Sequence, residues 1–317
     1  MAAVPSFGVN TTGSLGAILP GWTKLFSGKI RDIYRPASSG PYAGSDVYLI
    51  VATDRIAAFD RVIPTKIPGK GKILTQLSLW WFEKTADIVP NHVIAADNSP
   101  GIEDRGMLVR GLQMEPYEIQ VRGYVSDRVL GEYTRYGTID LNPVPPGLRS
   151  GDPFATPIIG VHLKGPLGER DTPIPWDSFQ ERVGSKCAEQ IERIALALYE
   201  RGHDIAASRG LILADAKFEF GRNADAGSDK LVFADEAFTP DSAHYWLRED
   251  YERLRQNGEV LRSYDKEVVG KWLASPQSGW NVRSGTQPPP IPADVVADTF
   301  ARYARVYQML TGTPWSR

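Results

Sequence analysis

The chain of 317 residues is long enough for two domains or one large α/β unit, and its 42% hydrophobic and 23% charged residues are typical of a globular protein. With 36 basic and 38 acidic side chains the net charge is −2, which excludes a disordered chain and a general nucleic-acid binder, so we expect no nucleic-acid partner. The single cysteine, Cys187, excludes an internal disulfide and fits a reducing compartment.

The N-terminal residues do not resemble an export signal. Residues 1–22 have no basic segment, and polar residues at 10–14 interrupt their short apolar stretch. Nowhere does the chain approach the roughly 20 consecutive apolar residues that are needed to span a bilayer. We therefore expect a cytoplasmic protein with no membrane partner.

Residues 1–115 predict a small N-terminal lobe built on a mixed sheet. Short apolar alternation between residues 22 and 34 lies on either side of Ser27-Gly28-Lys29, which predicts two strands joined at a glycine turn. Residues 47–52, VYLIVA, form the continuous apolar run of a buried strand. A helix is expected over residues 73–88, where apolar side chains recur at helical spacing.

Charged residues at the end of a buried strand are candidates for a site. Asp54 and Arg55 follow the apolar run at 47–52, and the glycine-rich and lysine-rich segment 67–72, IPGKGK, precedes the predicted helix. We therefore expect this edge of the N-terminal lobe to contribute to function.

Residues 116–317 predict a larger α/β lobe. Eight prolines and five glycines between residues 142 and 175 predict a long irregular segment rather than a packed element. The last helix is expected over residues 293–310, with Gly312 as its C-terminal cap.

A second long helix is expected to begin at Ser178. Glu181 lies three residues later, as in a capping box, and the apolar stripe that follows includes Cys187 and reaches Leu198. Because Cys187 lies on that stripe, we interpret it as a buried structural thiol rather than a nucleophile.

The segment 211–221, LILADAKFEFG, carries the pattern most suggestive of chemistry. Because side chains on a strand alternate, Asp215, Lys217 and Glu219 are expected on one face, and the other face carries Ile212, Ala214, Ala216, Phe218 and Phe220. A second strand that ends at Asp235 completes a predicted hairpin with a long loop. Carboxylates beside a lysine suit Mg²⁺ bound with a nucleotide phosphate, although a solvated, salt-bridged hairpin would show the same alternation.

The turn at Ser27-Gly28-Lys29 is a second indication of a nucleotide. Its glycine lets backbone N–H groups approach phosphates, its lysine supplies charge, and Arg31 follows two residues later. Together the turn and the acidic hairpin predict an ATP site between the lobes. The histidines, at 92, 162, 203 and 244, lack zinc-ligand spacing, and the esterase, Rossmann and Walker A motifs are absent.

Nine blocks of sequence, in order from about residue 22 to residue 312, resemble the SAICAR synthetases (phosphoribosylaminoimidazole-succinocarboxamide synthases). The blocks are FSGKIRDIY, VATDRIAAFD, IPGKGKILTQLSLWWF, RGMLVR, the E-x-x-VRGY of Glu118 to Tyr124, LILADAKFEFG, ADEAFTPDSAHYW, SYDKEVVGKWL and the last helix with its PPPIP lead-in. The resemblance implies a two-lobed α/β (α+β) fold with an ATP-grasp-like or kinase-like nucleotide site between the lobes.

The same resemblance implies a ligase that activates a carboxylate with ATP and Mg²⁺. An acyl phosphate forms, and an amine, L-aspartate in the family, attacks it to give an amide. Glu118 is expected in the segment that meets adenine, and Lys217 and Arg122 are expected to face the carboxylate substrate. Carried over by position, the cofactor-binding residues are Gly28, Lys29, Arg31, Lys70 and Glu118, the metal ligands are Glu219 and Asp235, and the catalytic residues are Arg122, Lys164, Asp171 and Lys217.

Departures from the family are concentrated where its substrates are held. Asp127 and Arg128 stand at the positions of a Gly-Ser pair, and His244 and Gly270 each replace an arginine. Arg170 is a further change. Each charge-assisted phosphate contact contributes about 1.5–3 kcal/mol, so these losses predict weaker ribonucleotide binding unless Arg128 compensates. We interpret all five as specificity determinants.

We therefore predict an ATP-dependent carboxylate–amine ligase that joins a heteroaromatic carboxylate to an amino acid such as L-aspartate in a specialised nucleoside or natural-product pathway. An authentic SAICAR synthase of purine biosynthesis is the alternative. A non-catalytic nucleotide-binding protein is a second alternative, against which the intact Lys29, Lys217, Glu219 and Asp235 argue. The sequence leaves the oligomeric state open, including a homo-oligomer.

Overall fold

The computed structural model describes residues 19–166, 171–223, 230–257 and 261–315. Arg170 and nearly all of the N-terminal segment 1–22 therefore lie outside the described residues. Within those ranges, no helix is long and apolar enough to cross a membrane.

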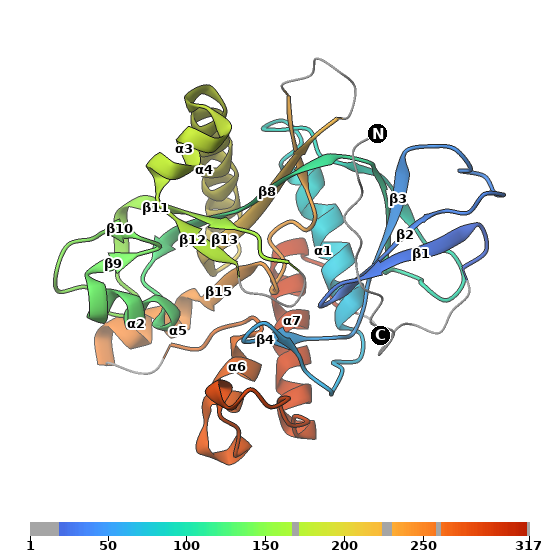
Figure 1. Cartoon of the computed structure of the whole chain (residues 1–317). Coiled ribbons are helices and arrows are strands. Elements are labelled where there is room, and N and C mark those ends of the chain that lie inside the picture. The colour runs from blue at the N-terminus through green and yellow to red at the C-terminus, as the bar shows by residue number, and fades with distance from the viewer. Residues whose placement is uncertain (1–18, 167–170, 224–229, 258–260, 316–317) are drawn as a thin grey trace.

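A five-stranded antiparallel sheet forms the N-terminal part of the fold (Figure 1). Its strand order is β1 (Trp22–Ser27), β2 (Arg31–Pro36), β3 (Val47–Ala52), β7 (Gly106–Arg110) and β6 (Val93–Asp97). The predicted glycine turn is confirmed, because the Gly28 N–H donates to the Arg31 carbonyl at 2.7 Å. Helix α1 (Lys70–Lys84) covers the sheet with Leu74, Leu77 and Trp81, and it confirms the predicted helix with an earlier start.

The second sheet has six strands and provides most of the C-terminal part. Its order is β12 (Thr172–Ile174), β11 (Pro153–Leu163), β8 (Gln113–Tyr124), β13 (Leu211–Arg222) and β14 (Leu231–Ala234), with β15 (Ala243–Leu247) also paired to β13. All of these pairs are antiparallel, and β13–β14 is the predicted hairpin. The position 115/116, at which we divide the chain into two lobes, falls within β8.

The prediction of an irregular segment between residues 142 and 175 is wrong. Strand β11 occupies its centre and pairs with β8 from Ile158 to Leu163, opposite Arg122 to Tyr117. The prolines misled the prediction because they lie where pairing is interrupted, at the register shift between Pro153 and Ile158. The β-branched residues that follow them, Ile158, Ile159 and Val161, favour a strand.

The helix expected from Ser178 is two helices. Helix α3 (Trp176–Val183) begins two residues before Ser178, and Gly184, with φ of 83°, separates it from α4 (Ser185–Ser208). A positive φ is readily available to glycine and ends the first helix there. Cys187 is half-buried against the main core, and its Sγ accepts a hydrogen bond from Arg222 Nη2 at 2.9 Å.

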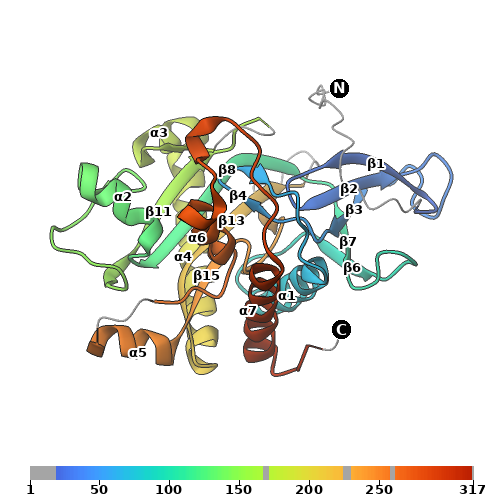
Figure 2. The same ribbon diagram turned by 90° about the horizontal axis from the view of Figure 1, so that it is seen from below.

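The remaining helices surround the second sheet and join the two sheets (Figures 1 and 2). They are α2 (Asp127–Tyr136), α5 (Arg248–Asn257), α6 (Glu267–Ala274) and α7 (Ala293–Thr311), with short 3₁₀ turns η1 (Pro276–Ser278) and η2 (Val282–Ser284). Helix α7 ends at Gly312 as predicted and packs beside α1. One core contains residues of both sheets, including Ile50, Ile119 and Phe233, and therefore ties the two sheets together.

Strand β13 does not alternate regularly over its whole length. Ala216, Phe218 and Phe220 belong to the main core, as expected for one face, but Ile212 and Ala214 pack with Trp246 in a separate cluster. A register shift against β15 lies between Leu213 and Asp215 and exchanges the two faces at that point. The expected single apolar face is therefore wrong at the start of the strand and correct from Ala216 onward.

Candidate active site

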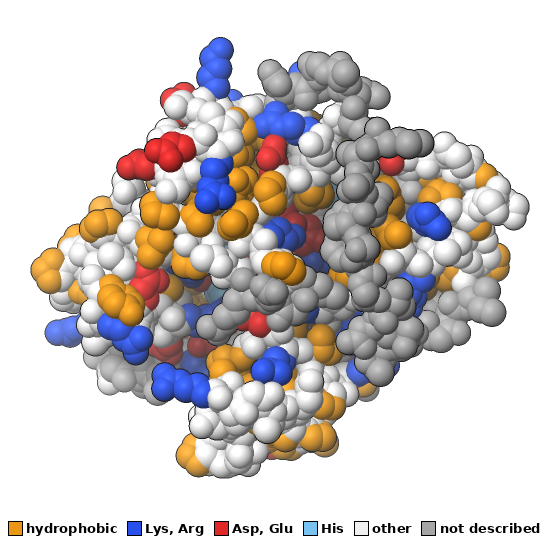
Figure 3. Space-filling model, in the orientation of Figure 1, with side chains coloured by type: hydrophobic (Ala, Val, Ile, Leu, Met, Phe, Trp, Pro, Cys, Tyr) orange, Lys and Arg blue, Asp and Glu red, His pale blue; other side chains and the backbone are white. Residues whose placement is uncertain are grey.

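A cavity of about 860 Å³ opens between the two sheets, and charged side chains of both signs gather in the hollow seen in Figure 3. Its walls come from the β1–β2 turn, the middle of β13, the end of β14, and helices α2 and α6. Of the residues expected to function, those that line it are Gly28, Lys29, Arg31, Glu118, Asp127, Arg128, Lys164, Asp171, Lys217, Glu219, Asp235 and Gly270.

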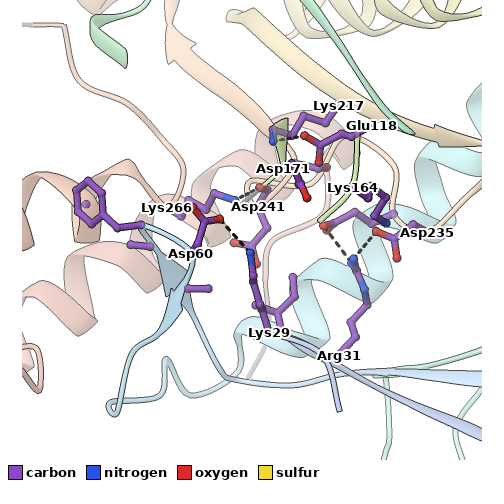
Figure 4. A pocket seen from close by; sticks show the side chains of 18 of the residues that line it. Lys29, Arg31, Asp60, Glu118, Lys164, Asp171, Lys217, Asp235, Asp241 and Lys266 are labelled. Carbon is purple, nitrogen blue, oxygen red and sulfur yellow. Dashed lines mark hydrogen bonds and ion pairs between the residues drawn. The ribbon is translucent and has the colours of Figure 1, made fainter. Parts of the chain in front are cut away.

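Lys29 lies at the mouth of the β1–β2 turn and faces a short hairpin. Its Nζ is 3.0 Å from Asp60 Oδ1 (Figure 4). The hairpin pairs β4 (Ala57–Ala58) with β5 (Arg61–Val62), and both connecting residues, Phe59 and Asp60, have positive φ. Such a two-residue connection requires this conformation, so the turn itself directs Asp60 toward Lys29.

Arg55 holds the turn from behind. Its guanidinium donates to the carbonyls of Gly28 and Arg31 at 3.0 and 3.2 Å, and its Nε donates to the Lys29 carbonyl at 3.3 Å. It also forms a 2.7 Å ion pair with Asp32, whose side chain is fully buried. Arg55 therefore fixes the candidate phosphate turn. The sequence analysis named it as a candidate site residue but gave it no role.

Replacing Arg55 with lysine should raise the KM for ATP by about tenfold, because one ammonium keeps the charge beside Asp32 but cannot reproduce a planar fork of donors. ATP titration of initial rates measures the effect. The KM for the carboxylate substrate should change less than twofold. An equal rise in both constants would contradict a local effect on the turn.

Two carboxylates, Glu219 and Asp235, lie next to each other on the β13–β14 hairpin. Glu219 pairs in register with Ala234, and Asp235 follows with a positive φ of 65°, an uncommon backbone conformation that fixes its side chain at the cavity. Burial and the neighbouring Asp235 raise the pKa of Glu219 to about 7, although Lys164 Nζ lies 2.6 Å from Glu219 Oε2. Arg31 ion-pairs with Asp235 (Figure 4).

Lys217 and Glu118 form an ion pair on the neighbouring strands β13 and β8 (Figure 4). Burial opposes ionisation of Glu118, but the Lys217 ammonium holds the pKa of this carboxyl below its usual value. Both residues line the cavity, so a cation and an anion are fixed beside each other in its wall.

Two of the expected site residues lie behind the cavity wall. Arg122 is buried and forms ion pairs with Asp140 at 2.6 Å and with Asp215 at 3.3 Å. Lys70 is fully buried, and its Nζ lies 2.5 Å from Asp241 Oδ2. Neither residue lines the cavity. Each one forms ion pairs with buried carboxylates behind the cavity wall instead.

Asp127, Arg128, Gly270 and Lys271 line a part of the cavity that we call the α2–α6 end, after the helices that carry them. Lys271 Nζ is 3.2 Å from Asp127 Oδ2, which joins the two helices. A Cβ added to Gly270 would meet no atom within 4 Å, so this wall is open. Three of the expected specificity residues are thus brought together, while His244 lies behind them and hydrogen-bonds to Arg128.

The cavity residues that the sequence analysis missed include Asp60, Asp241 and Lys266. Asp241 and Lys266 lie in blocks that carried the family resemblance, TPDS and DKEVVG, so that resemblance could have identified them. Lys266 Nζ donates to the Asp241 carbonyl at 2.5 Å, and its neighbour Asp241 pairs with Lys70. Asp60 likewise ends one of those blocks, VATDRIAAFD, although the direction of its side chain depends on the β4–β5 turn.

No group of three or more His, Cys, Asp or Glu side chains could hold a metal ion among the residues that the structure describes. Glu219 and Asp235 are a pair of carboxylates, and Mg²⁺ in nucleotide sites commonly takes only one or two protein carboxylates and completes its shell with phosphate oxygens and water. The donor set therefore fits Mg²⁺ bound together with a nucleotide and does not fit a metal held by the protein alone.

A family model described as SAICAR synthetase matches residues 24–286. A phosphoribosylaminoimidazole-succinocarboxamide synthase from Thermobifida fusca is 43% identical over 298 residues, which cover 93% of this chain and 92% of that protein, and one from Streptomyces avermitilis is 40% identical over 94% and 96%. The structure of SAICAR synthase from Saccharomyces cerevisiae complexed with SAICAR aligns with a TM-score of 0.78 and 32% identity, covering 96% of this chain and all of that one. The chain belongs to the SAICAR synthetase family, whose members are ATP-dependent ligases that form an amide C–N bond.

Proposed function

We propose that this chain is an authentic SAICAR synthase of purine biosynthesis, which joins the carboxylate of an aminoimidazole ribonucleotide to the amino group of L-aspartate in the cytoplasm. The observation that carries the proposal is the identity of 43% to a phosphoribosylaminoimidazole-succinocarboxamide synthase over nearly the full length of both chains. This similarity favours the purine reaction over the specialised pathway that we expected from the changed substrate residues.

The cavity has the charges that such a reaction needs. ATP donates its γ-phosphoryl group to the acceptor carboxylate, so negative charge accumulates on phosphate and carboxylate oxygens that approach each other. Lys29, Lys164 and Lys217 line one cavity and carry positive charge toward these oxygens. Ion pairs with Asp60, Glu219 and Glu118 hold the three ammonium groups in place before substrates bind.

The second step is attack of the aspartate amine on the acyl phosphate carbon, which forms the amide and releases inorganic phosphate. The amine must lose a proton during this step. Asp171 is the group we propose as its acceptor, because it lines the cavity and no cation lies within ion-pair distance of it among the described residues. Its Oδ1 accepts the Gly165 N–H at 3.0 Å, which orients the carboxylate.

Glu219 and Asp235 would hold Mg²⁺, which supplies positive charge to the ATP phosphates when it is bound. The protein's own contribution is to hold the two carboxylates close together. Their burial and their mutual repulsion raise the pKa of Glu219. Arg31 and Lys164 balance this pair in the metal-free protein.

Binding of Mg²⁺ should release close to one proton at pH 6, because Glu219 has a pKa of about 7 without metal and must ionise to bind it. The affinity should rise with pH by up to about tenfold per unit between pH 5 and 7 and level off above pH 7. Calorimetry in two buffers that differ in ionisation enthalpy measures the proton release. Glu219→Gln should bind weakly and without this pH dependence. Proton-neutral binding by the wild-type protein would contradict the assignment.

An ADP-release assay tests the proposed function. The protein is supplied with Mg²⁺, ATP, the carboxyaminoimidazole ribonucleotide and L-aspartate, and omission of either the acceptor or the amine should reduce ADP release to background. Succinocarboxamide product should appear in equal amount. Failure to turn over this acceptor while ATP is bound would sink the purine assignment.

A second candidate function is amide formation on a different heteroaromatic carboxylate. The observation that favours it is the open wall at Gly270, which leaves room for a larger acceptor. Parallel assays with a panel of heteroaromatic carboxylates distinguish the two candidates. Faster turnover of a panel member than of the purine precursor would support the second.

A further inference from the structure

Lys266 is a cation of the cavity wall that no carboxylate balances at close range. It lies just before helix α6, and in the part of the chain that the structure describes no carboxylate is within ion-pair distance of its Nζ. The Nζ donates to the main-chain carbonyl of Asp241 at 2.5 Å (Figure 4). Because a carbonyl has no net charge, this contact holds the ammonium in place and leaves its positive charge to act on the cavity.

The carboxylate of Asp241 belongs to the same residue as that carbonyl, but it contacts two other side chains. Its Oδ2 lies 2.5 Å from Lys70 Nζ, and its Oδ1 accepts a hydrogen bond from the Tyr303 hydroxyl at 2.5 Å. Lys70 and Tyr303 are fully buried, and neither lines the cavity. Both carboxylate oxygens are therefore held behind the cavity wall, although Asp241 itself lines the cavity.

Tyr303 reaches Asp241 from the last helix, α7. Its ring belongs to the main core, and α7 packs beside α1, which begins at Lys70 (Figure 2). Lys70 Nζ lies 6.0 Å from the centroid of the Tyr303 ring and also donates to the Arg55 carbonyl at 3.0 Å. Burial and the Asp241 carboxylate raise the pKa of Tyr303 well above its usual value, so the hydroxyl remains a donor. These contacts fix the Asp241 carboxylate without any contribution from Lys266.

Loss of the Tyr303 hydroxyl would leave one oxygen of the Asp241 carboxylate without its donor. A buried acceptor that has no partner costs free energy, so the carboxylate would turn toward another donor. Rotation of the side chain alone is enough to approach Lys266, because the ammonium already contacts the carbonyl of the same residue. The resulting ion pair would offset the positive charge that Lys266 otherwise presents to the cavity.

The charged groups around Lys266 have both signs. Burial lowers the pKa of Lys266, and Lys217 and Arg128 lower it further, whereas Asp241 and Glu236 raise it. Lys217 lines the same cavity, so the two ammonium groups act on the same space. A closer approach of the Asp241 carboxylate would raise the pKa of Lys266 and reduce the net positive charge in that space.

We propose that Tyr303 is a positioning residue of the ligase reaction: it holds the Asp241 carboxylate behind the cavity wall, so that Lys266 presents its charge to the reacting phosphate and carboxylate oxygens. Tyr303 contacts no substrate itself, because its side chain is fully buried. The inference rests on the proposed function for the reaction, in which negative charge accumulates on those oxygens. The alternative is a tyrosine that only stabilises the packing of α7.

The titration of Lys266 tests the inference without turnover. In protein labelled with ¹³C at lysine Cε, NMR follows the ionisation of each lysine, and the resonance that Lys266→Arg lacks identifies Lys266. Tyr303→Phe should raise the pKa of Lys266 by about one unit, because the Asp241 carboxylate approaches it. Tyr307→Phe, one turn further along α7, should leave that pKa unchanged, since the Tyr307 hydroxyl has no hydrogen-bond partner among the described residues. An unchanged pKa of Lys266 in Tyr303→Phe would overturn the proposal.

Steady-state kinetics measures the consequence for the reaction. Tyr303→Phe should lower kcat about tenfold, the size expected when one hydrogen bond to a charged group is lost, and should change the KM for ATP less than twofold. Tyr307→Phe should stay within twofold of the wild-type protein in both constants. Urea unfolding of the same variants gives their stabilities. Lower stability of Tyr303→Phe with an unchanged kcat would overturn the proposal, because it would show that Tyr303 serves only packing.

A double-mutant cycle shows whether Tyr303 acts through Lys266. When Lys266 is already methionine, Tyr303→Phe should lower kcat less than twofold further, because no ammonium remains for the Asp241 carboxylate to pair with. The same loss with and without Lys266 would overturn the positioning role.

The two measurements separate this inference from the proposed function. If the wild-type protein does not turn over the purine ribonucleotide, the proposed function fails, and the NMR titration of Lys266 still supports or overturns the role of Tyr303. If that acceptor is turned over and the pKa of Lys266 is the same in wild type and Tyr303→Phe, the proposed function stands and the inference is overturned.

Discussion

Replacing Lys217 with alanine is expected to lower kcat for amide formation by about 10²–10³-fold, the usual cost of removing one donor that stabilises charge in a transition state. Lys217 lies in the cavity wall on β13, and its ammonium is fixed by Glu118 before substrates arrive. ADP release under saturating substrates measures the loss. Lys230→Ala, an exposed lysine just before β14, is the matched control and should retain full activity. A kcat within threefold of wild type for Lys217→Ala would contradict the assignment.

The same substitution has a stability effect that must be separated from catalysis. Without Lys217, the Glu118 carboxylate, 13% exposed, loses its cation, and breaking a buried pair costs about 3–5 kcal/mol, with less expected here because Lys217 is 27% exposed. The double variant Glu118→Gln/Lys217→Met removes both charges. It should recover most of the stability in urea unfolding and none of the activity. Recovery of activity would show that the lysine is structural.

Replacing Gly123 with alanine should destabilise the fold by about 3 kcal/mol or more, because the new methyl group has no space. A Cβ at Gly123 would lie 2.0 Å from the Tyr199 hydroxyl oxygen. That hydroxyl is buried and donates to the Leu213 carbonyl at 2.7 Å, so it cannot move away without leaving a buried acceptor unpaired. The contact joins α4 to β8 and β13, the strands that carry the site.

Urea unfolding compares this variant with Gly131→Ala on helix α2, where an added Cβ meets nothing within 4 Å. The Gly131 variant should gain about 0.5–1 kcal/mol from improved helix propensity. Adding Tyr199→Phe to Gly123→Ala removes the clashing oxygen and should restore part of the stability. Equal stability of Gly123→Ala and wild type would contradict the packing argument.

The sequence was most informative where local pattern and tertiary structure agree. The glycine turn at Gly28, the β13–β14 hairpin and the last helix were predicted from residues that contact their immediate neighbours in the chain. Residues quoted from the family resemblance, such as Lys217 and Glu219, line one cavity for the same reason, because one strand carries them two positions apart.

Features that depend on long-range contacts were not predictable in the same way. The exchange of faces in β13 arises from its pairing with β15, which starts about thirty residues later, and no local pattern marks it. Similarly, Arg128 and His244 are 116 residues apart, so the sequence showed each as an isolated departure and not as a pair. Strand β11 was missed because prolines dominate its local composition while its pairing with β8 determines its structure.

The contacts of Arg55 have a consequence for how this protein can change over evolution. Its guanidinium holds the phosphate turn through backbone carbonyls of Gly28, Lys29 and Arg31, which every amino acid possesses. Side chains at positions 29 and 31 can therefore be exchanged without loss of the loop's shape. The shape depends instead on backbone hydrogen bonds such as that from Gly28 to Arg31 and on Arg55, 27 residues further along the chain from Gly28. The side chains that contact ligands can therefore change while the turn keeps its shape, so substrate preference can change without loss of the turn.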